Sequence, residues 1–131
     1  MGCVTRRSVR DGSEFERLAG YARAVRIGAH IAVSGTAALS DGVVLHPGDA
    51  YAQTREAIAK AIAAAAELGA SASDVIRTRL LLADGSDWHA AVRAHGEAFA
   101  GIDPANTTYF VAGFIPEGVL VEIELDAIVT G

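Results

Sequence analysis

Alternating apolar and acidic residues near the end of the chain restrict the possible fold more than any other feature. From Val121 to Val129, apolar residues take every second position, and Glu122, Glu124 and Asp126 lie between them. Successive side chains of a strand point to opposite faces of a sheet. A strand over Val119–Val129 therefore buries one face and carries acids on the other, so the sheet needs helices on only one side.

Four further strands are expected from apolar runs that turn residues separate. Tyr21–Ile27 and His30–Thr36 should meet in a tight turn at Gly28-Ala29. Val75–Ala83 ends in three leucines, as expected for a strand covered on both faces, and Thr107–Val111 precedes the last strand. Residues 1–19 are expected to form an arm or loop.

Two helices are expected between these strands. Asp49 is a good capping residue for a helix over Ala50–Leu68, and Gly69 is a good stop. A second helix is expected over about Trp88–Ala100. Its apolar stripe would consist of Trp88, Ala91, Val92, His95 and Phe99, which makes His95 a hydrogen-bonded core residue. The order of elements predicts an α+β fold, a mixed sheet with two helices packed on one face.

Length, charge and cysteine content exclude several classes of protein. The 131 residues suit one domain over 1–131, and the net charge of −5 with a single lysine offers little for nucleic acid. No apolar run reaches the roughly 18 residues of a membrane span. The polar N-terminus does not resemble a signal peptide, so a cytoplasmic protein is expected. Cys3, the only cysteine, has no disulfide partner and no neighbouring base to make it a nucleophile.

Cofactor motifs are missing from the sequence as well. The four histidines and the single cysteine form no pair with metal-ligand spacing, so no metal is expected. No glycine-rich loop follows a strand, so no nucleotide cofactor is expected either. Arg77 and Arg79 would share one face of their strand, and on the acid-bearing face of the sheet they could neutralise part of the acid stripe.

Several short segments stand out, in order, along residues 20–130: Gly20–Val25, Val33-Ser34-Gly35, Asp49–Arg55, Val75–Thr78, Pro104–Tyr109 and Val121–Glu124. Together they resemble the Rid family, the YjgF-type reactive intermediate deaminases. Each is weak alone, and the ordered set is specific. The resemblance implies a chorismate-mutase-like fold and a homotrimer whose helix-free sheet faces surround the threefold axis. It also implies small-molecule pockets between subunits.

The resemblance also implies a chemistry and a set of site residues. Rid deaminases hydrolyse an imine or enamine to a carbonyl compound and ammonia. Glu122 occupies the family's acid position, where a carboxylate can orient water or carry a proton. The other implied substrate-binding residues are Tyr21, Arg23, Ser34, Gly35, Asn106, Thr107 and Thr108. Ordinary alternatives remain open: Glu122 could be one rung of the acid stripe, and Tyr21 could simply pack on its strand.

This chain departs from the family pattern at three positions. Asn106 stands where deaminating members carry the arginine that binds a substrate carboxylate, and an amide is neutral and short. Val92 aligns with a pocket asparagine, and Arg23 stands in place of a glutamine. Arg23 is the best candidate for a compensating cation, with a strand arginine paired to an acid as the alternative. The departures argue against 2-imino acids as substrates.

Three functions fit the sequence. The first is a hydrolase or deaminase acting on a small imine or enamine other than a standard 2-imino acid, with Glu122 placing water. The second is a non-catalytic trimer that binds a small metabolite or serves a regulatory role. The third is a ribonuclease or translation inhibitor, against which the acid stripe argues because phosphate binding needs basic residues.

Overall fold

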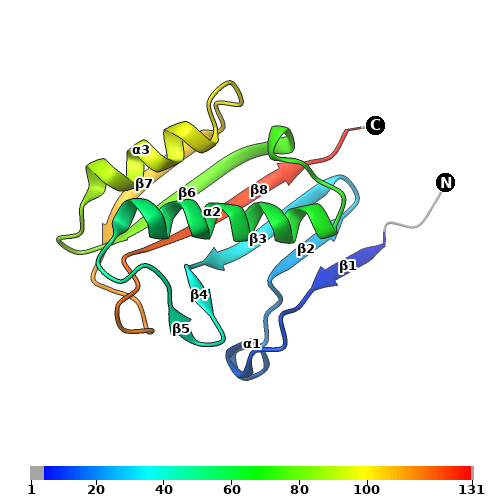
Figure 1. The fold of residues 1–131 in the computed structure, drawn as a ribbon. Coiled ribbons are helices and arrows are strands. Elements are labelled where there is room, and N and C mark those ends of the chain that lie inside the picture. Colours follow the sequence, from blue (N-terminus) through cyan, green and yellow to red (C-terminus); the bar gives the residue numbers. More distant parts are fainter. Residues whose placement is uncertain (1–4, 131) are drawn as a thin grey trace.

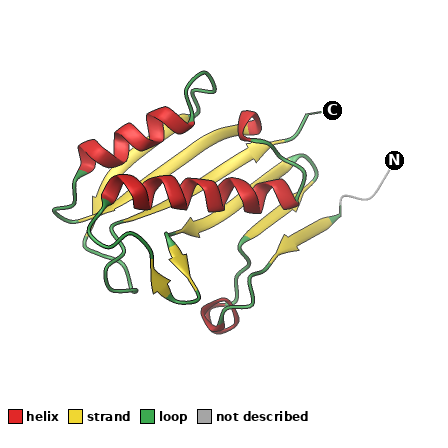
Figure 2. Ribbon diagram, viewed as in Figure 1, coloured by secondary structure: helices red, strands yellow, loops and turns green. Residues whose placement is uncertain are grey.

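The computed structural model describes residues 5–130 as one mixed sheet with two long helices across one face (Figures 1 and 2). The strands of this sheet are β1 (Arg6–Val9), β2 (Ala24–Ile27), β3 (His30–Thr36), β6 (Val75–Ala83), β7 (Ala105–Val111) and β8 (Val121–Ile128). The helices are α1 (Glu14–Ala19), α2 (Ala50–Glu67) and α3 (Trp88–Ala98), with a short 3-10 helix η1 (Ala72–Asp74) and a small hairpin of β4 (Leu39–Ser40) and β5 (Val43–Val44). The predicted α+β fold is confirmed.

The six strands lie in the order β1-β2-β3-β8-β6-β7. All neighbours in this sheet are antiparallel except β6 and β7. A parallel pair needs a crossover connection, and α3 supplies it. The N-terminal strand β1 and the strand β7 are therefore the two edges of the sheet, and the last strand of the chain runs through its middle.

Local sequence signals place the helix starts and the first hairpin as expected. The Asp49 side chain accepts a hydrogen bond from the backbone N–H of Ala52 at 3.0 Å, and Asp87 accepts one from Ala90 at 3.1 Å. Gly69 follows α2 with a φ of 100°, a conformation that favours glycine. The hairpin of β2 and β3 turns at Gly28-Ala29, although β2 begins only at Ala24.

The predicted alternation in β8 is also confirmed. Val121, Ile123 and Leu125 are fully buried on the helix-covered face. Glu122, Glu124 and Asp126 lie half-buried on the other face. Arg79 on β6 lies 3.6 Å from Glu124 and 3.8 Å from Asp126, so it neutralises part of the acid stripe as predicted.

The N-terminal segment differs from the expected arm or loop. Within the described residues, β1 pairs with β2, and Ser13 caps α1 by accepting a hydrogen bond from the Glu16 N–H at 3.2 Å. Four residues of strand and six of helix are too short for hydrophobic periodicity to show, and contacts made elsewhere in the chain fix them. Cys3 lies outside the described residues.

The buried side of α3 also differs from the predicted stripe. Trp88 and Val92 are 46% and 39% exposed, whereas Ala91 and Ala94 are buried with Phe99 at the helix end. The small alanines face the rest of the core, and the two larger side chains lie toward the β7 edge. They border a small cavity of about 240 Å³ there. His95 is half-buried and hydrogen-bonded, as predicted.

Candidate functional site

The predicted site residues lie in two groups. Tyr21, Arg23, Ser34, Gly35 and Glu122, here called the glutamate cluster, line one large open cavity of about 1460 Å³. Asn106 and Thr108 lie on the edge strand β7 and form a second group with two residues that the sequence did not point to as site residues. This second group, Thr78, His95, Asn106 and Thr108, is called the asparagine cluster.

Glu122 is the chemically distinctive member of the glutamate cluster. Its side chain lies on the helix-free face of β8, beside the irregular pairing between β3 and β8. A Cβ atom added at Gly35 would stand 2.6 Å from Glu122 Oε1, so the glycine leaves the space that the carboxylate occupies. Burial raises the pKa of Glu122, Arg23 opposes that rise, and Glu124 adds to it.

No hydrogen bond from residues 5–130 contributes to the pKa of Glu122. A half-buried carboxylate without a protein donor has its acceptor positions open to water or to a ligand. A raised pKa brings such a carboxyl group closer to the range where it both accepts and releases protons near neutral pH. The geometry is therefore suited to moving a proton at a small molecule in the cavity.

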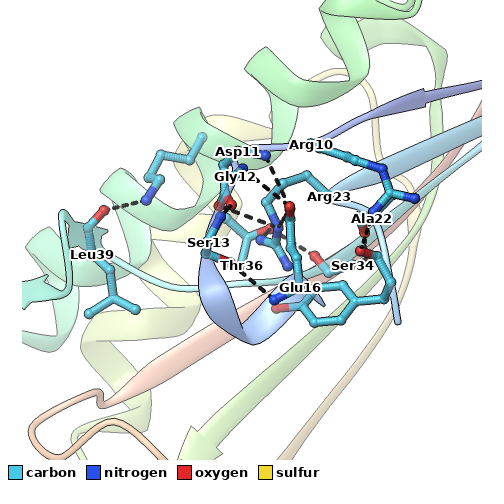
Figure 3. A network of polar contacts seen from close by, with 12 residues as sticks. Arg10, Asp11, Gly12, Ser13, Glu16, Ala22, Arg23, Ser34, Thr36 and Leu39 are labelled. Carbon is cyan, nitrogen blue, oxygen red and sulfur yellow. Dashed lines mark hydrogen bonds and ion pairs between the residues drawn. The ribbon is translucent and has the colours of Figure 1, made fainter. Parts of the chain in front are cut away.

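Arg23 is held by protein groups on several sides (Figure 3). One terminal nitrogen donates to the carbonyl oxygen of Gly35 at 3.0 Å, and the other donates to Thr36 Oγ1 at 3.3 Å. Its Nε lies 3.7 Å from a carboxylate oxygen of Glu16 and 3.9 Å from one of Asp11. The guanidinium is thus engaged within the chain, which leaves little of it to bind the carboxylate of a ligand.

The N-terminal segment completes this cluster in a way that the sequence did not predict. Glu16 is only 2% exposed, and its carboxylate accepts hydrogen bonds from the backbone N–H groups of Asp11 and Gly12. Phe15, from the same short helix, packs edge-on against Tyr21 with ring centres 6.2 Å apart. No local motif could reveal these partners, because neither the strand nor the helix has a recognisable period.

Tyr21 and Ser34 serve the local structure of the cluster. The guanidinium of Arg23 lies 5.5 Å from the centre of the Tyr21 ring, within the range of a cation–π interaction. Ser34 donates its hydroxyl hydrogen to the carbonyl oxygen of Ala22 at 2.7 Å. Both residues line the cavity, and the Ser34 hydrogen bond ties β3 to the segment before β2.

The asparagine cluster is a chain of hydrogen bonds on the helix-covered face. Thr108 Oγ1 donates to Asn106 Oδ1 at 2.8 Å, and Asn106 Nδ2 donates to Thr78 Oγ1 at 3.0 Å. Thr78 Oγ1 lies 2.8 Å from His95 Nε2. Burial lowers the pKa of His95, which favours the neutral ring.

Thr107 and Val92 take different positions around β7. Thr107 points to the opposite face from Asn106, where its hydroxyl oxygen accepts a hydrogen bond from Arg77 at 3.4 Å. Val92 lies beside the asparagine cluster and borders the small cavity. That cavity is lined by Leu82, Trp88, Val92, Thr108, Tyr109 and Phe110. The structure therefore groups Asn106 with Thr108 and Val92, and separates Thr107 from them.

The two clusters lie on opposite faces of the sheet within one chain. Glu122 alternates with buried residues of β8, whereas Asn106 bonds to the buried side chain of Thr78. The glutamate cluster lines the large cavity, and Thr108 of the asparagine cluster lines the small one.

Within residues 5–130, no three histidine, cysteine, aspartate or glutamate side chains gather where a metal ion could bind. None of the helices described there is both long and apolar enough to cross a membrane.

The fold and the cavities define an α+β protein with a half-buried carboxylate on the helix-free face of its sheet. Comparison of this chain with known proteins identifies its family. The family described as endoribonuclease L-PSP matches residues 12–129. The chain belongs to this family, which is also called the YjgF or Rid family.

Individual relatives agree with this assignment. The chain is 42% identical over 121 residues to the uncharacterized protein SCO2049 of Streptomyces coelicolor, covering 92% of this chain and 90% of that protein. The crystal structure of Rv2704 from Mycobacterium tuberculosis, a member of the YjgF/YER057c/UK114 family, matches with a TM-score of 0.85 and 42% identity. That match covers 95% of this chain and 100% of Rv2704. The YjgF gene product of E. coli matches with a TM-score of 0.74 and 26% identity, over 84% of this chain and 88% of that one.

Proposed function

We propose that this protein is a Rid-type hydrolase that removes ammonia from a small imine or enamine other than a standard 2-imino acid. The observation that carries the proposal is the half-buried Glu122 carboxylate, whose pKa is raised by burial and which no group in residues 5–130 binds. It faces a cavity large enough for a small molecule and water. Family membership supports the same reaction class.

In the proposed reaction, Glu122 orients a water molecule toward the carbon of the C=N bond. A C–O bond forms as the carboxylate accepts a proton from the water, and the π electrons of the C=N bond move to nitrogen. Glu122 then returns the proton to nitrogen. The hydroxyl proton then passes to the amino nitrogen, the C–N bond breaks with its electrons going to nitrogen, and ammonia leaves while the oxygen becomes the new carbonyl oxygen.

Asn106 and Arg23, the two positions considered for binding a carboxylate, argue against a 2-imino acid as the substrate. Asn106 has no charge with which to bind a carboxylate, and Arg23 is engaged by Gly35, Thr36 and two acids. Losing a charge-assisted hydrogen bond costs about 1.5–3 kcal/mol, which is a strong penalty for a small substrate. A neutral imine or enamine avoids this penalty.

The proposed active form is a homotrimer with small-molecule pockets between subunits. Its support is the separation of the two clusters on opposite faces of one sheet, because a second copy is needed to close a site around Glu122 and Asn106. The helix-free face would pack against a partner, as the family resemblance implies. Sedimentation of the purified protein measures the assembly directly, and a monomer would contradict this part of the proposal.

The family description names an endoribonuclease, and the charges of this chain oppose that activity. Its net charge is −5, and the acids of β8 line the helix-free face. Arg79 is already paired with two of them. A site that binds an RNA backbone needs a surplus of basic groups, which these strands do not offer.

The test compares imine hydrolysis by the wild type, Glu122→Gln and a matched control, Glu124→Gln. An uncharged imine would be generated in situ by an amine oxidase and its loss followed against a buffer blank. Glu122→Gln should lose about 10²–10⁴-fold of the activity, the usual contribution of a general acid–base group. Glu124→Gln, two residues along the same face, should keep most of it. Equal activity of wild type and Glu122→Gln would leave a non-catalytic binding protein as the better hypothesis.

A second comparison tests the substrate class. A 2-imino acid should be a poor substrate for the wild type and a better one for Asn106→Arg, because arginine restores a bidentate partner for the carboxylate. A wild type that already hydrolyses the 2-imino acid rapidly would show that another cation binds it.

A further inference from the structure

The orientation of the Asn106 side chain is fixed by the group that it faces. Its amide nitrogen lies 3.5 Å from the backbone carbonyl oxygen of Thr78 and 3.0 Å from Thr78 Oγ1. A carbonyl oxygen only accepts hydrogen bonds, so the atom turned toward it must be the nitrogen. The side-chain oxygen therefore points away from β6, toward Thr108.

The buried threonine and the histidine give the whole chain of hydrogen bonds one direction. Thr78 is fully buried, and its hydroxyl oxygen already receives a hydrogen from Asn106. We assign its single hydrogen to His95 Nε2, which takes the tautomer with no proton on that nitrogen, so that the hydroxyl both accepts and donates. Donation thus runs from Thr108 to Asn106, from Asn106 to Thr78, and from Thr78 to His95. Hydrogen bonds aligned in this way reinforce one another.

The atoms left for a ligand at this edge are mainly acceptors. Asn106 Oδ1 keeps one free lone pair, and Thr108 Oγ1 keeps lone pairs because its hydrogen is already donated. Asn106 is exposed, and Thr108 lines the small cavity, whose other walls are apolar or aromatic. The nearest arginine on β6, Arg77, bonds to Thr107 on the other face.

We propose that the asparagine cluster selects an uncharged ligand that places an N–H donor against Asn106 Oδ1 and a short apolar group against Trp88, Val92 and Phe110. This inference rests on the proposed function, since it names the substrate class of that site: a neutral imine or enamine has such an N–H next to carbon. A carboxylate would bring its oxygens against two oxygen acceptors, and none of the described residues that line the small cavity is a cation that could offset the loss of hydration. Asn106 is then a specificity residue, and Thr78 and His95 position it.

The test uses two probes of nearly the same shape, isobutyramide and isobutyrate. Each is titrated at neutral pH into uniformly ¹⁵N-labelled protein, and binding is followed at the side-chain NH₂ of Asn106 and the backbone N–H of Thr108. The amide should bind at least about tenfold more tightly, the ratio that one well-placed hydrogen bond supplies. Equal or tighter binding of isobutyrate overturns the inference. So does the absence of any shift at Asn106 with either probe at the solubility limit.

A variant isolates the role of the buried hydroxyl. Thr78→Val keeps the shape of the side chain and the backbone carbonyl, but it removes the closer of the two acceptors that hold Asn106 Nδ2, so the amide preference should fall. Thr54→Val is the matched control, because it removes an equally buried hydroxyl from α2, where it donates to the carbonyl oxygen of Ala50. A full amide preference in Thr78→Val would show that Thr78 does not position Asn106.

The tautomer of His95 gives a readout in the wild type that does not depend on any variant folding. Nitrogen chemical shifts should show Nε2 without a hydrogen. A hydrogen on Nε2 would mean that His95 donates to Thr78, and it would overturn the role of His95 in positioning Asn106.

The same titration on Glu122→Gln separates this inference from the proposed function. If Glu122→Gln loses turnover and keeps the amide preference, both the proposed function and this inference are supported. Intact turnover with an intact preference contradicts only the role of Glu122, and loss of the preference in the wild type contradicts only the inference.

Discussion

The glutamate cluster and the asparagine cluster hold their polar side chains in place through different kinds of interaction. In the glutamate cluster, opposite charges bind one another: Arg23 lies among Glu16, Asp11 and the backbone of β3, and Glu122 has no hydrogen-bond donor within residues 5–130. The asparagine cluster contains no charge, and each hydroxyl or amide is oriented by the next. The difference indicates that the proposed reactive group, Glu122, and the proposed selective group, Asn106, are held independently on different strands.

The largest expected effect on stability comes from removing Arg23. In Arg23→Met, the buried carboxylate of Glu16 loses its cation and keeps only its backbone donors. Breaking a buried ion pair from one side costs about 3–5 kcal/mol, and partial exposure of Arg23 (19% of its side chain) should reduce this to about 2 kcal/mol. Urea unfolding measures the change.

Arg17→Met is the control for this substitution. Arg17 also pairs with a glutamate of α1, but both side chains are largely exposed, so the free energy of unfolding should not change measurably. Equal stability of Arg23→Met and Arg17→Met would contradict the ion pair between Arg23 and Glu16. Arg23 would then be available to bind an anionic ligand.

A smaller effect, on activity rather than stability, is expected from Gly35→Ala. The added Cβ would stand 2.6 Å from Glu122 Oε1, so the carboxylate must move away from its present position. A displaced catalytic group should reduce kcat by about tenfold, or about 1.4 kcal/mol of barrier. Asparagine-cluster binding, read from the isobutyramide titration, should not change.

Gly96→Ala is its counterpart on α3. A Cβ at this position meets no atom within 4 Å, and alanine suits a helix better than glycine. This variant should keep its activity and gain up to about 1 kcal/mol of stability. A loss of activity in both variants would mean that glycine replacement acts through general stability, not through Glu122.

The smallest expected effect is on the pH dependence of stability, to which Glu122 and His95 should contribute with opposite signs. The folded-state pKa of Glu122 is raised, so its contribution to stability is present below its ordinary value of 4.5 and is lost as the pH rises through the folded pKa. The pKa of His95 is lowered, so its contribution is present above 6.5 and is lost as the pH falls through the folded pKa.

Unfolding titrations on two variants separate these contributions. Glu122→Gln should be stabilised relative to the wild type at neutral pH, and the gain should vanish at acidic pH. His95→Gln should show its smallest loss of stability in acid. Changes of the same sign in both variants would contradict the assigned environments.

Parts of this molecule follow from short sequence spacing. The alternation from Val121 to Leu125 and the cap at Asp49 depend only on near neighbours, and both were predicted. The pairing of Glu16 with Arg23 was not predicted. It joins a helix of six residues to the residue before β2, and such a short helix leaves no periodic pattern in the sequence. The bonds from Asn106 to Thr78 and from Thr78 to His95 were also missed, since they require the parallel register of β6 and β7 and the crossover of α3.

The difference between local spacing and distant contacts also explains why only some of the predicted site residues lie together. Family resemblance placed Glu122, Tyr21 and Gly35, and these residues do line one cavity. It also grouped Thr107 with its neighbours, although the side chain of Thr107 lies on the other face of β7. A motif read as consecutive letters does not separate the two faces of a strand, whereas the period of two does.

The alanines of α2 that face the sheet have a consequence for how this protein tolerates mutation. Ala57, Ala61 and Ala65 are buried in the same core cluster as Val121 and Ile123, the residues on either side of Glu122. These small side chains share a closely packed core with the strand that carries the acid, so a larger residue at any of the three would press on the core behind that strand. We therefore expect these three alanines to tolerate few larger residues, even though they lie on the face of the sheet opposite the proposed chemistry.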